Sequence, residues 1–303
     1  MARTFDFFSN IDDFKDVVSG VDSSTMLSEM QGSYERAKQT IVSVIGQALW
    51  DVLKTQFASQ DADEKKDKAV AYLQGALGNR TYYHHLIFKV VGKKKEQVSF
   101  YKYEIQAMQE NYLDAYWSYM DQLLTLFTSD TQTFQGWTET KMYKTLNELL
   151  IKTAADFSEY CGLDGSDYFF NRTIHLQLQV SDTDLASRQI TAATYAEKPK
   201  LERNIKRAIA YRTTARAIFQ FDYPDLPRSL RNDIFNEFSK NKGAQETHVK
   251  EAISQLFHRQ ADEYWNLIDQ ELNQPVDEDG DSLDIDFPGD DINDIDNSHY
   301  LMA

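Results

Sequence analysis

Residues 114–122 of the chain, DAYWSYMDQ, return as DEYWNLIDQ at residues 262–270. Two further words recur in the same order and at nearly the same separation: AVAY (69–72) as AIAY (208–211), and DDF (12–14) as ADF (155–157). Helical proteins share short apolar words by chance, so any one match alone is weak. Three matches in register favour an internal duplication, in which the second half of the chain repeats the first.

Apolar residues at three- and four-residue spacing predict long amphipathic helices around these words. In the first half we expect helices over Ser33–Leu53, with Ser33 as its cap, over about Asp61–Phe88, and over about Ser99–Phe127. The third helix would be roughly 40 Å long, because an α-helix rises 1.5 Å per residue. Helices joined by short connections pack as antiparallel neighbours in a bundle.

The polar segment SDTQTFQGWT, residues 129–138, has the composition of a linker. We therefore predict an all-α fold of two tandem, internally duplicated small helical bundles. The N-terminal repeat covers residues 1–130, the C-terminal repeat covers residues 131–274, and an extended acidic tail covers residues 275–303. The stretch Ile174–Val180, IHLQLQV, alternates as a strand does. The duplication instead places it in a helix, which we favour, and the strand stays open as the alternative.

The composition agrees with long helices. Among 303 residues there are 12 glycines and 5 prolines, and 42% of the residues are hydrophobic. No apolar stretch is long enough to span a membrane, and the segment MARTFDFFSN lacks the pattern of a secretory signal. The single cysteine, Cys161, excludes an internal disulfide framework and a cysteine-based zinc site. We expect the chain to belong to a reducing cytoplasm, or to something assembled there.

The charge is unevenly distributed along the chain. The formal net charge is −16, which argues against DNA binding by the bulk surface, because phosphate contacts require clustered Lys and Arg. Ten of the acidic residues, and no basic residue, lie between Asp277 and Asp296. The predicted folded body is therefore only mildly acidic, and most of the negative charge belongs to the tail.

A search for catalytic and metal-binding motifs finds weak candidates only. The sequence has no phosphate-binding Gly-rich loop, no GxGxxG, no HExxH and no repeated Glu-x-x-His. His84 and His85 point about 100° apart on a helix, so they could bind a metal only with the help of other ligands. The pair His248 and Glu251 is typical of the exposed face of a helix. Cys161 has no nearby histidine that would activate its thiol. We predict no catalytic, cofactor-binding or metal-binding residue, no cofactor, and a protein that is not an enzyme.

The aromatic residues favour a protein that is buried by partners. Tyr103 lies off the apolar stripe of the third helix, and Tyr116 and Trp117 are neighbours that cannot both face one core. Exposed Tyr and Trp are typical of protein interfaces. We therefore predict that Tyr103 and one of Tyr116 or Trp117 contact another subunit. Trp265, the counterpart of Trp117 in the second repeat, is a further interface candidate.

A basic segment stands out in the second repeat. Residues 198–216 carry seven basic residues and one acidic residue. When AVAY is aligned with AIAY, Arg212 and Arg216 fall on the apolar side of the helix, where the first repeat has Leu73 and Leu77. A buried arginine must meet carboxylates, carbonyls or phosphate, so both arginines are interface candidates. The alternative is that this end of the helix simply emerges into solvent.

Apolar residues are spaced between the acids of the C-terminal tail. A tail that only solvates the protein needs none of them, whereas a segment that orders on a partner uses both its charges and its hydrophobes. We expect the tail to dock on a neighbouring protein or on the basic helix of a neighbouring subunit; the alternative is a disordered tail that aids solubility. The tail's interface candidates are Phe287, Ile292 and Ile295.

Several stretches together resemble a family of two-repeat helical proteins encoded by phages and prophages of Bacteroides-type bacteria, including crAss-like phages. In the first half these are SYERAKQTIVSVIGQALWDVL, KAVAYLQGALGNRTYYHHL and YKYEIQAMQENYLDAYWSYMDQLL. In the second half they are residues 149–157 and RAIAYRTTARAI. The likeness covers about residues 10–272. Arg212 and the long acidic tail depart from the family.

The resemblance implies a phage virion structural protein, a head–tail connector or neck-ring subunit that joins the portal to the tail. Its implied partners are further copies of itself in a ring of about twelve, the portal protein, and further neck or tail ring proteins. DNA would pass only as cargo in the channel, and no membrane is involved. The implied location is the virion neck or tail, assembled in the host cytoplasm. The alternative is a soluble cytoplasmic regulatory protein or DNA mimic.

Overall fold

The computed structural model describes residues 5–59, 62–95, 102–240 and 246–273; for residues 89–95, 102–103, 238–240 and 246 it describes the backbone alone. Within these ranges the regular elements are helices, together with one isolated bridge between Phe5 and Phe8. The predicted all-α fold class is confirmed. None of the described helices is long and apolar enough to cross a membrane.

The first half consists of a short helix, two medium helices and two long ones. Their bounds are α1 (Ile11–Val17), α2 (Gln31–Ile45), α3 (Gln47–Ala58), α4 (Glu64–Lys95) and α5 (Lys102–Ser129), with a 3₁₀ turn, η1 (Leu27–Met30), before α2.

The single helix predicted over Ser33–Leu53 is wrong in two respects. It begins at Gln31, so Ser33 is a buried helical residue and not a cap. It also breaks at Gly46, whose φ of +82° is rarely adopted by residues that have a Cβ. The Gly46 N–H donates to the Val42 carbonyl and ends α2, and α3 begins at the next residue.

The second half has more and shorter elements. Their bounds are α6 (Gln135–Thr138), α7 (Lys141–Leu146), α8 (Ala154–Cys161), α9 (Asp167–Val180), the π-helical turn η2 (Ser181–Leu185), α10 (Ala192–Tyr195), α11 (Pro199–Gln220), the 3₁₀ turn η3 (Tyr223–Asp225), α12 (Arg228–Lys240) and α13 (Glu246–Leu272).

The stretch Ile174–Val180 is helical and forms the end of α9, as favoured above. Its apolar residues do not follow a single stripe, because α9 is buried on several sides. This burial explains why the sequence of a helix alternates in the manner of a strand.

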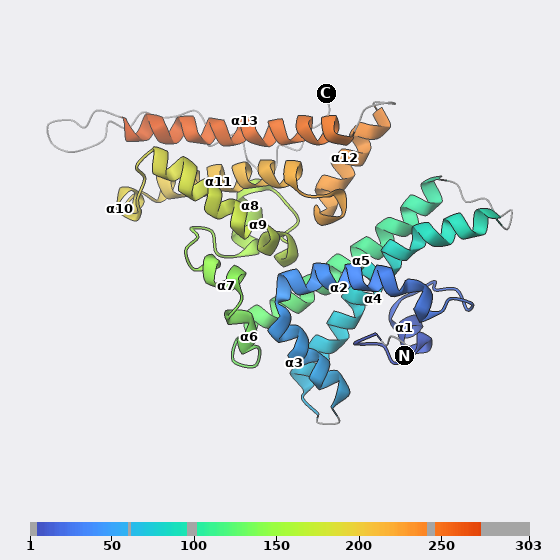
Figure 1. Cartoon of the computed structure of the whole chain (residues 1–303). Helices are drawn as coiled ribbons and strands as arrows, with labels where there is room; N and C mark the ends of the chain where they lie inside the picture. Colours follow the sequence, from blue (N-terminus) through green and yellow to red (C-terminus); the bar gives the residue numbers. More distant parts are fainter. Residues whose placement is uncertain (1–4, 60–61, 96–101, 241–245, 274–303) are drawn as a thin grey trace, which may run out of the picture.

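Two pairs of long antiparallel helices, which we call hairpins, organise the molecule (Figure 1). In the first half α4 packs along α5, and α2 and α3 lie against α4. In the second half α11 packs along α13, with α8 and α9 on α11. The helix α9 also contacts α5, so the hairpins meet through it (Figure 1). One apolar core cluster runs through both halves.

Candidate functional site

The connection from α11 to α12 lies against the first half of the chain. The Trp117 indole N–H on α5 donates to the Pro224 carbonyl at 3.1 Å. The Tyr223 hydroxyl donates to the Glu110 carboxylate on α5 at 2.9 Å. These contacts join residues that are more than a hundred positions apart in the sequence. These hydrogen bonds form a junction between the two halves, which we take as the candidate site.

Arg231, at the start of α12, is the most deeply buried charge of this junction. Its side chain is 1% exposed. Its guanidinium donates to Glu110 at 3.1 Å, to Asp114 and, at 2.8 Å, to the Leu226 carbonyl. It also lies over the Trp117 ring. A buried guanidinium is tolerated only when it is paired and hydrogen-bonded, and here two carboxylates and a carbonyl meet that requirement.

Asp225, in η3, links the halves a second time. One of its oxygens accepts from Arg80 on α4, the other from Arg172 on α9, each at 3.3 Å. Arg80 is 5% exposed and lies between the rings of Tyr83 and Tyr116. We call the set of Arg80, Arg172, Arg231, Glu110, Asp114 and Asp225 the arginine clamp.

The prediction that Tyr116 or Trp117 is exposed at a subunit contact is wrong. Tyr116 is 0% exposed and Trp117 is 6% exposed. Both rings pack edge-on against the ring of Tyr168, and the Tyr116 hydroxyl donates to the Tyr168 hydroxyl at 2.9 Å. The two neighbouring residues therefore share one partner, Tyr168 of α9. Tyr116 is further covered by Arg80 of α4, and Trp117 by the connection that carries Pro224.

A cleft of about 290 Å³ lies beside the clamp, between the two halves. Asp121 on its wall accepts from the Ser166 hydroxyl and the Tyr168 N–H, both at 2.8 Å, and so caps α9. Burial raises the pKa of Asp121 to about 6, against the lowering effect of these two hydrogen bonds, and the nearby Asp167 and Asp164 raise it further. Asp164 accepts from the Ser229 N–H at 2.9 Å. The cleft thus holds a carboxyl group that titrates near neutral pH, with its oxygens engaged in a helix cap.

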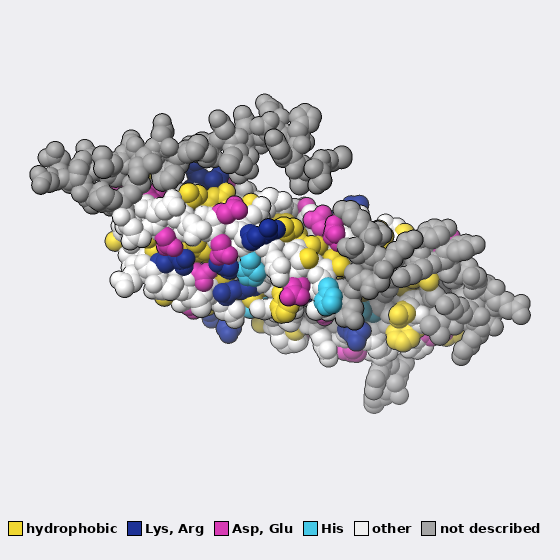
Figure 2. All heavy atoms as spheres, turned by 90° about the horizontal axis from the view of Figure 1, so that it is seen from above, with side chains coloured by type: hydrophobic (Ala, Val, Ile, Leu, Met, Phe, Trp, Pro, Cys, Tyr) yellow, Lys and Arg dark blue, Asp and Glu magenta, His cyan; other side chains and the backbone are white. Residues whose placement is uncertain are grey.

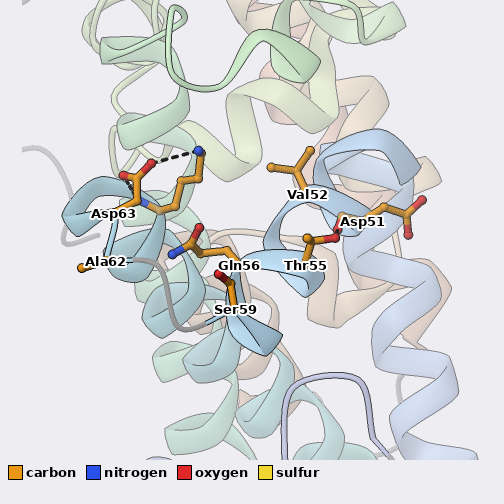
Figure 3. A pocket seen from close by; sticks show the side chains of 8 residues that line it. Asp51, Val52, Thr55, Gln56, Ser59, Ala62 and Asp63 are labelled. Atoms are coloured by element: carbon orange, nitrogen blue, oxygen red, sulfur yellow. Dashed lines mark hydrogen bonds and ion pairs between the residues drawn. The ribbon is translucent and has the colours of Figure 1, made fainter.

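A wider, open hollow of about 610 Å³ lies where α3 ends and α4 begins (Figure 3). Its wall mixes apolar and polar groups: Val52 and Ala62 line it, Thr55 donates to the carbonyl of Asp51, and Lys66 pairs with Asp63 at 2.9 Å (Figure 3). This ion pair lowers the pKa of Asp63. Lys66 and Asp63 neutralise each other, and the Asp51 carboxylate accepts a hydrogen bond from Gln47, so the walls resemble ordinary surface.

The second-half candidates are engaged within the chain. Trp265 is 1% exposed and lies under the guanidinium of Arg188, which forms a two-pronged pair with Asp269. Arg212 pairs with Asp184 at 3.3 Å and with Asp262, and contacts His258. Arg216 pairs with Asp184 at 3.9 Å.

The sequence predicted that Arg212 and Arg216 meet carboxylates, carbonyls or phosphate, as interface candidates; in the structure both pair with carboxylates of their own chain. The π-helical turn η2 carries Asp184, which both arginines share. Nothing in the sequence pattern pointed to η2 or to Asp184 as the partner.

Of the other reactive groups that the sequence offers, His84 and Cys161 are held in unreactive forms. Burial, with the charges of Arg80 and Arg36, lowers the pKa of His84 to about 3, so its ring is neutral. Cys161 is 5% exposed, and burial raises the pKa of its thiol to about 12. His248 and Glu251 are exposed on α13. Across the part of the chain that the structure describes, no three His, Cys, Asp or Glu side chains come together as metal ligands.

Four candidates lie where the structure gives no side-chain contacts. Tyr103 belongs to α5, but its side chain is outside the described set. Phe287, Ile292 and Ile295 lie outside the described residues altogether. The clamp residues were missed by the sequence analysis, because Arg231 and its carboxylate partners are separated by more than a hundred residues and form no local pattern.

Comparison with protein families, with curated proteins and with solved structures finds no match to the chain, so none of these comparisons links it to phage virion proteins.

Proposed function

We propose that the chain is a structural subunit of a phage virion, one copy of a ring at the neck that joins the portal to the tail. The observation that carries the proposal is the arginine clamp. Its charge pairs join the two halves, which differ in structure. A ring subunit that binds one neighbour through each half requires such a firm connection between them.

The proposed duplication is supported by where the repeated words lie. Residues 69–72 and 208–211 belong to α4 and α11, and residues 114–122 and 262–270 belong to α5 and α13. The word at 12–14 lies in α1 and its counterpart at 155–157 in α8. In the first half α1 contacts α4, and α4 packs along α5. In the second half α8 contacts α11, and α11 packs along α13. Divergence of the two copies would supply two different faces to one subunit.

Exposed apolar residues on both hairpins support contacts with other subunits. On α4, Ile87 is 55% and Phe88 is 66% exposed; on the second hairpin, Phe219 is 60% and Leu256 is 50% exposed. Large exposed hydrophobes on two separate elements suit a head-to-tail ring, in which one face of a subunit binds a different face of the next.

The test is the assembly state of the purified full-length chain, measured by native mass spectrometry and electron microscopy. We expect closed rings of about a dozen copies. Phe88→Ser and Phe219→Ser should each reduce ring formation at least tenfold, while Val52→Ser, at an exposed apolar position of α3, should leave the ring intact. A chain that stays monomeric at high concentration would contradict the ring and favour the regulatory alternative.

A further inference from the structure

The junction between the halves is made of two surfaces. The contributing surface is the connection from α11 to α12, residues 223–227, together with Arg231. The receiving surface lies on α4 and α5, where Arg80 pairs with Asp225 and Asp114 pairs with Arg231. Under the proposed duplication each half carries a version of both surfaces, and the chain itself joins only one version of each.

The second half's version of the receiving surface is exposed. The alignment of AVAY with AIAY makes Phe219 the counterpart of Arg80. The alignment of the longer repeated words makes Asp262 the counterpart of Asp114. The side chains of Phe219 and Asp262 are each more than half exposed. Arg212, which pairs with Asp262, lies seven residues before Phe219 and therefore on the same side of α11.

The junction shows how Asp262 can take a further cation. Asp114 binds two arginines there, one through each carboxylate oxygen. Its counterpart Asp262 binds Arg212 through Oδ1. Figure 2 shows apolar side chains among charged ones on the face of the molecule that carries α13. The surface formed by Phe219 and Asp262, which we call the α11–α13 surface, thus offers a partner both an apolar and an acidic contact.

The first half's version of the contributing surface is exposed as well. On the alignment of AVAY with AIAY, Ile87 and Phe88 are the counterparts of Leu226 and Pro227. Leu226 and Pro227 are buried at the junction, whereas Ile87 and Phe88 are each more than half exposed. The chain is helical at Ile87 and Phe88, whereas α11 ends at Gln220, so the first half presents the side of a helix in place of a connection.

An arginine lies near this exposed apolar pair. Arg36 on α2 is exposed, and no ion pair joins it to a residue that the structure describes. Its neighbour Glu35 accepts a hydrogen bond within α2. Burial and the charges of Arg80 and Arg36 lower the pKa of His84, about one helical turn before Phe88, so Arg36 lies near this part of α4. We call Arg36, Ile87 and Phe88 the α4 surface.

We propose that the α4 surface of one copy of the chain docks on the α11–α13 surface of a second copy, with Ile87 and Phe88 against Phe219 and with Arg36 paired to Asp262. This contact repeats between chains the arrangement that the junction makes within one chain. The two surfaces differ, so each copy binds one neighbour through α4 and another through α11 and α13, as a closed ring requires. The proposal rests on the proposed ring subunit and names the faces that the ring uses.

A mixture of two variants tests the pairing of the surfaces. Phe88→Ser disables the α4 surface and keeps the α11–α13 surface, and Phe219→Ser does the reverse. Each variant alone should stay monomeric, because neither has both surfaces intact. An equal mixture, with one variant isotope-labelled, should form a dimer of one chain of each kind. In native mass spectrometry this mixed dimer should exceed any dimer of either variant alone by about tenfold or more.

A second variant of the α4 surface separates the role of the surface from the effect of one substitution. Arg36→Glu should form the mixed dimer with Phe219→Ser and should fail to form it with Phe88→Ser. Val52→Ser, at an exposed position of α3, is the control and should assemble as the wild type does. Circular dichroism checks that each variant is folded. As an independent measurement, a short bismaleimide should join Phe88→Cys to Phe219→Cys between two chains and should not join Val52→Cys to Phe219→Cys.

The outcomes separate this pairing from the ring itself. A wild-type chain that stays monomeric would contradict both. A wild-type ring, with neither a mixed dimer of the two variants nor the cross-link, would leave the ring standing and overturn the pairing. A dimer of Phe88→Ser alone or of Phe219→Ser alone would also overturn it, because one of the surfaces would then bind its own copy.

Discussion

At the scale of single residues, buried and half-buried guanidinium groups in both halves meet a carboxylate from another helix. Arg231 meets Glu110 and Asp114, Arg80 meets Asp225, and Arg212 meets Asp184. Asp121 has no such cation among the described residues and instead accepts hydrogen bonds at the start of α9. Burial raises its pKa to about 6, with a further increase from Asp167 and Asp164.

Asp121 should make the stability of the protein depend on pH in an unusual direction. Its pKa is about 6 in the folded chain and 3.8 as the ordinary value. Between these values the folded state binds a proton that the unfolded state does not, so this group's contribution to stability falls as the pH rises through 4 to 6. Relative to Asp121→Asn, the wild-type chain should lose on the order of 2 kcal/mol of unfolding free energy between pH 4 and pH 7.

Urea unfolding at several pH values, with both chains at equal salt, measures this difference. Glu263→Gln, at an exposed position of α13, is the control and should follow the wild type across the range. If the wild type and Asp121→Asn differ by the same amount at pH 4 and pH 7, the group does not titrate as its surroundings indicate.

At the scale of the elements, glycines decide where helices break and how closely they pack. Gly46 separates α2 from α3 through its positive φ. Gly75 lies within the helix α4 and does not break it; instead it lets α4 and α5 approach closely. A Cβ at this position would come within 2.6 Å of the Tyr119 ring on α5. The long hairpin of the first half therefore depends on a missing side chain at the point where its helices approach.

Gly75→Ala should destabilise the protein although alanine is the better helix former. Alanine gains up to about 1 kcal/mol in helix propensity, but overpacking against a ring costs about 1–3 kcal/mol, so we expect a net loss of about 1 kcal/mol. Gly32→Ala is the matched control, because a Cβ at Gly32 meets nothing within 4 Å in α2. Thermal unfolding should show a lower Tm for Gly75→Ala and an unchanged or higher Tm for Gly32→Ala. A stabilised Gly75→Ala would mean that the hairpin is more open there.

At the scale of the whole molecule, the clamp and the shared core make one unit of the two halves. The core cluster is continuous, and the charge pairs of the clamp cross from α4 and α5 to η3 and α12. Buried pairs of this kind add little net stability when complete, but breaking one leaves an uncompensated buried charge. The clamp therefore serves to fix the arrangement of the halves, and its loss should affect both of them.

Arg231→Met should destabilise the folded chain by about 3 kcal/mol, because it leaves Glu110 and Asp114 without their shared guanidinium. Arg228→Met removes a 70% exposed partner of the same Asp114 and should change stability by less than about 1 kcal/mol. Denaturant unfolding followed by fluorescence and by circular dichroism measures both effects. We expect one coincident transition in wild type and separate transitions in Arg231→Met. Equal losses in the two variants would show that the clamp is not a desolvated pair.

The sequence by itself determined the helical class and the approximate position of the long helices. Helix formation depends on neighbours three and four residues away, and the stripes around residues 69–72 and 114–122 record that periodicity directly. The sequence also indicated that Arg212 and Arg216, if buried, need carboxylates, carbonyls or phosphate, since burial of a charge is costly wherever it occurs.

The tertiary structure alone decided which groups meet. Tyr116 and Trp117 are both buried because α5 lies between two sets of helices, a fact that no pattern within α5 encodes. Arg231, Glu110 and Asp225 form a site because the η3 connection folds back onto the first half across more than a hundred residues. Periodicity is a property of the local chain, whereas charge pairing and burial depend on contacts that exist only after the two halves have packed.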